Sequence, residues 1–199
     1  GALKWQIKEL VTIAPDNLLL DYFESPVDNQ AQNKINVVCS PLKEVKDIVT
    51  ALNVDNLKVA SITTEEFAFA NLVTAKKDAV LLVCAQPKEE IVLVIVKNGQ
   101  LFFHRRLRGF TQIADKSPEE LDMGNIDSLS LEIQRSTDYF ERQLKQASIK
   151  EILVLVPMDN EAYLARRLAE NTNVPVNLLT LPALYSEHRE NACALGAKM

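Results

Sequence analysis

The chain has 199 residues, a formal net charge of −5 at pH 7 and 47% hydrophobic residues, a composition typical of a globular protein with one sizeable domain or two small lobes. Its acidic balance would repel a phosphate backbone and argues against nucleic-acid binding. No apolar run approaches the roughly 18 residues of a membrane-spanning helix, and no secretory signal is recognisable, so direct membrane insertion is not expected.

Short helices and strands alternate in the first part of the chain. Apolar residues spaced by three and four positions predict helices, and short apolar or β-branched runs between turn residues predict strands. In chain order we predict a helix over 2–11, strands over 17–24 and 34–39 with a polar turn at 26–29, a helix that buries Leu42, Val45, Ile48, Val49 and Leu52, a strand over 58–63 and a helix over 66–72. Ser40 and Pro41 suit the start of the first long helix, and Thr63 or Thr64 suits the start of the helix over 66–72.

A charged break at Lys76-Lys77-Asp78 predicts the boundary between two lobes, 1–76 and 77–199. Beyond it, Asn98-Gly99 is a strong signal for a β-hairpin. The predicted order is strands over 79–85, 91–96 and 100–107, a largely irregular segment over 110–126, the longest helix over 128–147, a strand over 151–156, a helix over 160–171, a strand over 176–180 and a helix over 183–197. This alternation predicts an α/β fold with a mixed sheet.

The cysteines form no recognisable cross-linking or metal-binding pattern. Cys39, Cys84 and Cys193 are odd in number, far apart and without paired spacing. This pattern suits structural thiols in a reducing cytosol and argues against a disulfide framework or a zinc site.

Neither a phosphate cradle nor a catalytic constellation is recognisable. Only five glycines are present, and no two lie close enough for a dinucleotide fingerprint or a P-loop. The two histidines, His104 and His188, are not paired with a nucleophile or a carboxylate cluster in a productive pattern. The acidic residues within 115–127 lack the spacing of a calcium loop and are interpreted as a solvated loop. We therefore expect no catalytic and no metal-binding residues.

One basic segment has two open interpretations. On a strand, His104, Arg106 and Arg108 would share one face. They could form a site for an anion or an acidic peptide, or they could be a solvated strand end whose charges are matched by nearby carboxylates. The frequency of surface arginines and the acidic overall charge favour the second interpretation.

Five segments, taken in chain order, carry a family resemblance. They are Leu3 to Leu10 followed by Asn17 to Phe23, the three strands around Asn98-Gly99, the helical run Leu131-Glu132-Ile133-Gln134-Arg135-Ser136-Thr137-Asp138-Tyr139-Phe140, the strand over 151–156 followed by Val174-Pro175-Val176, and Ala194-Leu195-Gly196. Together they resemble the PilM-like proteins of type IV pilus assembly, and within that family most closely the branch that serves the MSHA pilus. The resemblance spans nearly the whole chain.

The resemblance implies an actin-like (ribonuclease H-like) α/β fold of mixed sheets. Residues 1–76 would be a truncated first lobe, the partner-binding side, whose front part with the first phosphate hairpin is missing, and 77–199 would be the second lobe. Ala85 and Pro87 stand where the family has the aspartate and glycine of the second phosphate hairpin, and 156–160 lacks the glycines of the adenosine motif. Loss of the carboxylate and of close backbone approach predicts no ATP turnover and no cofactor. ATP could bind only if the missing upstream segment supplied a phosphate loop.

The resemblance also implies a partner. The chain would be a cytoplasmic scaffold, peripheral to the inner membrane, that docks the short cytoplasmic tail of a PilN-like inner-membrane protein, with the assembly ATPases as a further class of partner. Tyr22 and Phe23 are the candidate aromatic anchors, or else ordinary core residues of a strand. Docking by a helix in a groove and by strand addition both stay open. The alternatives are an actin-like nucleotide switch, an unrelated α/β enzyme, and the cytoplasmic domain of a GspL-like secretion protein, which has the same fold.

Overall fold

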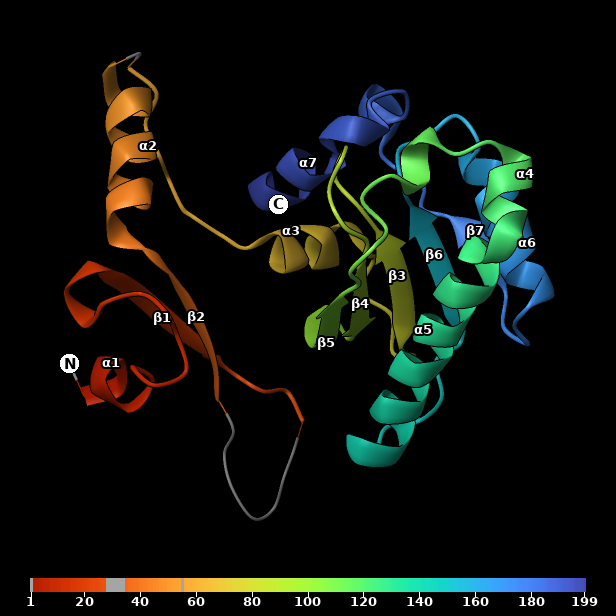
Figure 1. The fold of residues 1–199 in the computed structure, drawn as a ribbon, viewed down its shortest axis with the longest axis horizontal. Helices are drawn as coiled ribbons and strands as arrows, with labels where there is room; N and C mark the ends of the chain where they lie inside the picture. Colours follow the sequence, from red (N-terminus) through yellow and green to blue (C-terminus); the bar gives the residue numbers. More distant parts are fainter. Residues whose placement is uncertain (1, 28–34, 55) are drawn as a thin grey trace. The chain divides into compact units, whose positions relative to one another are not determined.

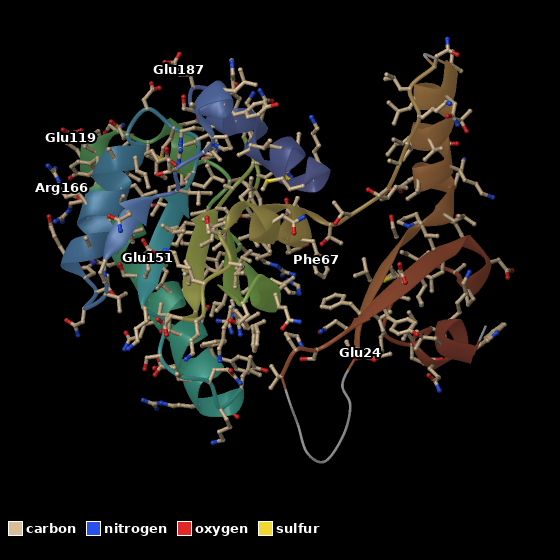
Figure 2. All side chains as sticks on the ribbon, turned by 180° about the vertical axis from the view of Figure 1, so that it is seen from behind. Glu24, Phe67, Glu119, Glu151, Arg166 and Glu187 are labelled. Atoms are coloured by element: carbon tan, nitrogen blue, oxygen red, sulfur yellow. The ribbon has the colours of Figure 1, made fainter. Side chains whose placement is uncertain are left out.

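The computed structural model describes residues 2–27, 35–54 and 56–199, which divide into two compact units, Gly1–Ile62 and Thr63–Met199 (Figure 1). The division lies before the boundary expected after residue 76, because the segment that contains Lys76 belongs to the second unit. Lys76 Nζ lies 2.5 Å from Glu151 Oε2, and the Lys76 carbonyl accepts from the Asn98 amide at 2.8 Å. Figure 2 shows Glu151 on the sheet of this unit. The charged break is therefore an integral part of the second unit.

The first unit is a β-hairpin followed by a helix. Its elements are α1 Ala2–Gln6, a 3₁₀ turn Pro15–Asn17, β1 Leu18–Glu24, β2 Ile35–Pro41 and α2 Leu42–Val54. The strands are antiparallel, from Leu18 opposite Pro41 to Glu24 opposite Ile35. Ser40 pairs with Leu19 inside the ladder, so the prediction that it caps the helix is wrong. Of the polar turn predicted at 26–29, Asp28 and Asn29 lie outside the described residues.

The first unit buries very little of its own surface. Among its described residues only Leu18 is buried. The residues predicted to be buried in α2 are at most half-buried, and Ile48 is 61% exposed. The predicted strand over 58–63 has no regular structure, because Val59 and Ile62 are exposed and pair with no neighbouring strand. The apolar side chains of this segment are exposed because no other described element of the unit packs against them.

The second unit is built on a five-stranded mixed sheet. Its strands are β3 Val80–Cys84, β4 Val92–Lys97, β5 Gln100–Arg106, β6 Glu151–Leu155 and β7 Val176–Leu178, in the order β5-β4-β3-β6-β7. β3, β4 and β5 form an antiparallel meander, whereas β6 and β7 run parallel to β3. Asn98 and Gly99 both have positive φ, as the predicted hairpin requires. The mixed α/β sheet is confirmed.

Helices cover both faces of this sheet (Figure 1). α3 Glu65–Leu72 and α7 Ala192–Lys198 pack on one face, with Phe69 and Ala192 against Val80, Leu82 and Val94. On the other face α5 Ile126–Asp138 and α6 Glu161–Glu170 contribute Leu129, Ile133, Leu164 and Leu168 against Leu81, Val83 and Ile152. Two covered faces explain why β3 and β4 are apolar throughout. Each fully buried Leu, Ile or Val contributes about 1.5–3 kcal/mol.

The segments around α5 and α7 differ from the predictions. The supposedly irregular 110–126 contains the turns Ile113–Asp115, Pro118–Glu120 and Leu121–Asn125, and a capping box joins Ser117 and Glu120. The helix predicted over 128–147 is α5, which begins at Ile126 and is followed by a π-helical turn, Tyr139–Gln143. The predicted helix over 183–197 is two short turns, Ala183–Tyr185 and Arg189–Asn191, followed by α7. Arg189, in the second of these turns, directs its side chain to Glu161 at the start of α6.

Cys84 yields a prediction on pH dependence. Its side chain is fully buried, and burial raises the pKa of the thiol well above its usual value, with Cys193 and Glu66 adding to the shift. A raised folded-state pKa contributes stability that is complete below the unfolded value of about 8.5 and is lost as the pH rises beyond it. We expect Cys84→Ala to flatten the decline of the free energy of unfolding above about pH 8.5, measured by urea denaturation. Cys39→Ala is the control, and an unchanged decline in Cys84→Ala would contradict the prediction.

Candidate functional site

The family resemblance places the two altered nucleotide loops, 85–87 and 156–160, directly after β3 and β6. The backbone amide of Ala85 donates to the Leu155 carbonyl at 3.1 Å. The amide of Val156 donates to Glu161 Oε1 at 2.7 Å. Pro87 has no amide hydrogen. These two strand ends therefore direct their first amides into the protein.

Glu161 and Arg189 form a largely buried ion pair next to the end of β6. Arg189 Nε donates to Glu161 Oε2 at 2.5 Å, and Nη2 donates to Oε1 at 2.8 Å. The same guanidinium donates to the carbonyls of Leu179 at 2.8 Å and Val154 at 3.2 Å. The Glu161 side chain is 7% exposed and that of Arg189 22%. The pair joins the start of α6, the end of β6 and the segment after β7.

The Glu161–Arg189 pair is suited to holding structure. A carboxylate at the first turn of a helix is stabilised by the helix dipole, and the two-pronged arginine contact fixes its orientation. Both carboxylate oxygens of Glu161 already accept hydrogen bonds, one of them also from Val156. The sequence analysis missed this pair. The two residues are 28 positions apart, and no local pattern links them.

The basic segment at the end of β5 faces α5 across a depression of about 450 Å³, here called the arginine groove. Its lining residues are Arg105, Arg106, Leu107, Arg108, Phe110, Ser128, Leu131, Glu132 and Arg135. On the other side of β5, carboxylates match the charge as predicted. Arg106 pairs with Glu65, and His104 Nδ1 lies 3.8 Å from Glu66. The solvated-strand interpretation is thus correct for His104 and Arg106.

The acidic stretch behaves as a hydrogen-bonded surface. Asp122 accepts from the Tyr163 hydroxyl at 2.7 Å and from Arg167 Nε at 2.9 Å, and these bonds lower the pKa of its carboxyl. In the described part of the chain, no three His, Cys, Asp or Glu side chains gather to hold a metal ion. His188 lies on the surface with Nδ1 3.5 Å from Glu190.

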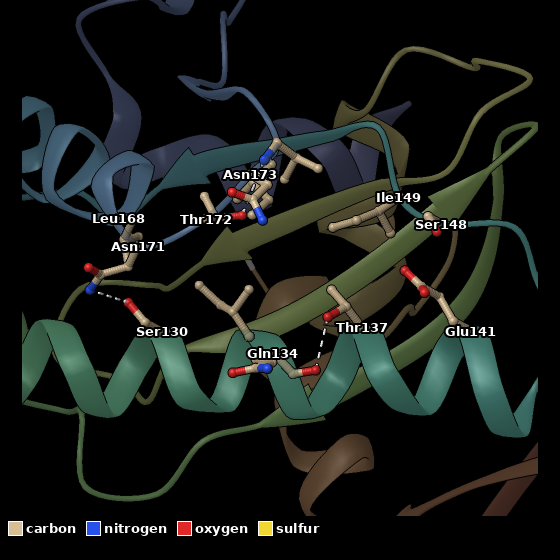
Figure 3. Close-up of a pocket in the computed structure, with 13 residues that line it drawn as sticks. Ser130, Gln134, Thr137, Glu141, Ser148, Ile149, Leu168, Asn171, Thr172 and Asn173 are labelled. Carbon is tan, nitrogen blue, oxygen red and sulfur yellow. Dashed lines mark hydrogen bonds between the residues drawn. The ribbon is translucent and has the colours of Figure 1, made fainter.

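A second depression, about 450 Å³ in volume, lies between α5 and the start of β6 (Figure 3). Its rim carries neutral hydroxyl and amide side chains, and its only charged residue is Glu141. Part of this rim is already bonded, because Asn171 Nδ2 donates to Ser130 Oγ at 3.1 Å. The pocket lies at the end of the sheet opposite Ala85 and Val156, since Ile149 and Ile152 mark the beginning of β6.

The two candidate anchors lie next to each other on β1. Tyr22 is 57% exposed and stands opposite Val37, and Phe23 is half-buried opposite Asn36. Successive strand residues point to opposite faces, so the two rings lie on different faces of the hairpin. An exposed Tyr22 is not an ordinary core residue. Whether either ring binds a partner stays a prediction.

Comparisons with known proteins identify the fold. No protein-family model matches the sequence, and no curated protein matches it. A chain of the PilM-PilN type IV pilus biogenesis complex superposes with a TM-score of 0.67 at 20% identity, over 98% of this chain and 69% of that one. A Bacteroides thetaiotaomicron protein with actin-like ATPase fold and unknown function gives 0.50 at 10% identity, over 99% and 65%. The cytoplasmic domain of EpsL, an inner-membrane component of the type II secretion system of Vibrio cholerae, gives 0.45 at 9%, over 85% and 61%.

At these identities the likeness shows the fold alone, and the third score is too low to support an argument. The predicted actin-like α/β fold is confirmed by the first two. The chain spans less than two thirds of the second and third neighbours. Within the described residues, no helix is long and apolar enough to cross a membrane.

Proposed function

We propose that this chain is a cytoplasmic scaffold of a type IV pilus assembly platform, of the MSHA (MshI) type, and that it docks the short cytoplasmic tail of a PilN-like inner-membrane protein. The observation that carries the proposal is the superposition on a chain of the PilM-PilN complex over 98% of this chain. The order of the motifs along the sequence supports the same family. The chain would then be peripheral to the inner membrane through its partner.

The strand ends of the second unit support a scaffold over a nucleotide switch. Phosphate sites rely on free backbone amides that approach the ligand closely, usually at glycine. Here the amides of Ala85 and Val156 donate to protein acceptors. Pro87 and Pro157 remove two further donors. This arrangement supports a role without ATP turnover.

The first unit is the proposed docking side. Its hairpin contains β1 and β2 alone, so within the described residues each strand has one edge that pairs with no other strand. Such an edge can accept an added strand from a partner, and aromatic side chains beside it supply the anchoring contacts. Tyr22 is exposed on β1 and is the first residue to test.

We expect saturable binding of the N-terminal cytoplasmic peptide of the PilN-like protein, measured by fluorescence anisotropy, and no binding of a fluorescent ATP analogue with magnesium. Tyr22→Ala should weaken peptide binding about tenfold, the scale of an interface hot spot. Leu184→Ala, an exposed apolar residue of the second unit, is the control and should bind as the unaltered chain does. Tight nucleotide binding would favour the switch alternative, and absence of peptide binding would refute the scaffold proposal.

A further inference from the structure

The arginine groove has more positive charge than the protein around it neutralises. Four of its nine lining residues are arginines, and Glu132 is the one carboxylate among the nine. The carboxylate of Glu90 lies nearby, where its two oxygens accept hydrogen bonds from the amides of Gly109 and Phe110 at 2.9 and 2.7 Å. Glu132 is shared, because its Oε2 lies 3.6 Å from Arg105 Nη1 and its Oε1 lies 2.5 Å from Arg135 Nη1. Within the described residues, Arg106 is the one of the four with another carboxylate partner, Glu65 or Glu66 at the start of α3. The guanidinium of Arg105 also lies over the Phe103 ring, 5.4 Å from its centroid.

Arg108 is the least satisfied of these arginines. It takes part in no ion pair or hydrogen bond with the residues that the structure describes, and it adjoins Gly109 at the turn after β5. Farther along the groove, α5 presents Arg135, whose side chain is 59% exposed. The two walls of the groove therefore offer guanidinium groups from a strand end and from a helix.

The floor between these walls is apolar. Leu107 and Phe110 are buried there, and Leu131 on α5 is 46% exposed. Arginine binds carboxylates with two parallel hydrogen bonds, and an exposed leucine adds hydrophobic contact with a neighbouring side chain. A chain with carboxylates on either side of an apolar residue matches this arrangement.

We propose that the arginine groove binds a short acidic peptide segment of a partner protein, with the carboxylates of the segment taken by Arg108 and Arg135 and an apolar side chain set against Leu131. The proposal is separate from tail docking on the first unit, and either can fail without the other. The shape argues for a peptide, because a flat anionic bilayer does not reach into a depression between a strand end and a helix.

The test uses a fluorescein-labelled peptide of sequence Glu-Asp-Leu-Asp-Glu and the full 199-residue chain, followed by fluorescence anisotropy. We expect saturable binding that weakens with added salt, since screening reduces the attraction between exposed charges. A peptide in which the acids are replaced by their amides should bind about tenfold more weakly. Equal binding of the two peptides would overturn the proposal.

Variants separate the groove from the general charge of the protein. Arg108→Gln with Arg135→Gln should weaken binding of the acidic peptide about tenfold. Arg142→Gln with Arg166→Gln removes the same charge from helical surface outside the groove and should leave affinity unchanged. Equal losses in both double variants would mean nonspecific charge attraction and would overturn the proposal.

A gain in affinity provides the sharper readout, because partial unfolding cannot mimic it. Glu132 competes with the peptide for Arg105 and Arg135, so Glu132→Gln should tighten binding roughly threefold. Unchanged or weaker binding in this variant would contradict the groove as the site. Vesicles containing phosphatidylglycerol form the last comparison. Retention of the chain on them that depends on Arg108 and Arg135 would replace the peptide by a membrane as the ligand and overturn the proposal.

Discussion

Arg189→Ala is expected to lower the free energy of unfolding of the second unit by about 3 kcal/mol, because it leaves the Glu161 carboxylate buried without its counter-charge. Among the described residues, Glu161 would keep the Val156 amide as its one close hydrogen-bond donor, and the Leu179 carbonyl would lose its bond from Arg189. The Val154 carbonyl would keep its bond from the Leu179 amide at 2.8 Å. Guanidinium denaturation followed by far-ultraviolet circular dichroism measures the change.

The matched control is Arg167→Ala on α6. Arg167 Nε lies 2.9 Å from Asp122 Oδ1 and its guanidinium also contacts Glu170, but this network is open to solvent and should contribute far less to stability than the Glu161–Arg189 pair. The double change Glu161→Gln with Arg189→Met should cost less than Arg189→Ala alone, since it leaves no charge buried. Equal losses for Arg189→Ala and Arg167→Ala would show that the buried pair has no special role.

Gly196→Ala is expected to destabilise the second unit by about 2 kcal/mol, although alanine is the better helix former. A Cβ at this position would lie 1.9 Å from the Ala68 carbonyl oxygen and 2.7 Å from its carbon. These are backbone atoms of α3, so α7 would have to move away and break the hydrogen bond from Asn71 Nδ2 to the Gly196 carbonyl at 3.0 Å. Thermal unfolding of the variant measures the loss.

The control for helix propensity is Ala194→Gly, at an exposed position of the same helix, which should cost about 1 kcal/mol. In Gly196→Ala, the higher helix propensity of alanine should therefore raise the free energy of unfolding, whereas the clash with α3 should lower it by more. A stabilised Gly196→Ala would show that α7 does not pack closely against α3 in solution. The same glycine was recognised in the sequence only as part of the Ala194-Leu195-Gly196 motif. Its close contact with α3 was not predicted.

Local patterns were sufficient for the sheet of the second unit. The strands β3 to β6 were predicted within about two residues, because apolar runs and turn residues act over a few neighbouring positions. Asn98-Gly99 is the clearest case, since a two-residue turn of this kind requires positive φ and these residues tolerate it. The elements that were mispredicted are those whose ends depend on distant contacts. The helix predicted to start at residue 183 is interrupted at Arg189, whose partner is Glu161.

In the first unit, local sequence patterns did not predict which residues are buried. Its apolar periodicity predicted a buried helix and a strand over 58–63, but α2 buries none of its residues in the described structure. A sequence pattern specifies which face of an element is apolar, and it does not specify what covers that face. Tyr22 and Phe23 were chosen as candidate anchors by residue type alone, and the structure adds that Tyr22 is exposed.

The sequence by itself determined the α/β class, the hairpin, the lack of glycine-rich phosphate loops and the basic segment at the end of β5. These features follow from residue type and spacing along a short stretch of chain. Only the tertiary structure decided the unit boundary at Ile62, the pairing of Glu161 with Arg189 and the presence of Arg108 and Arg135 in one groove. The last two bring together residues that are distant in sequence, and they do so because the helices must cover the two apolar faces of one sheet.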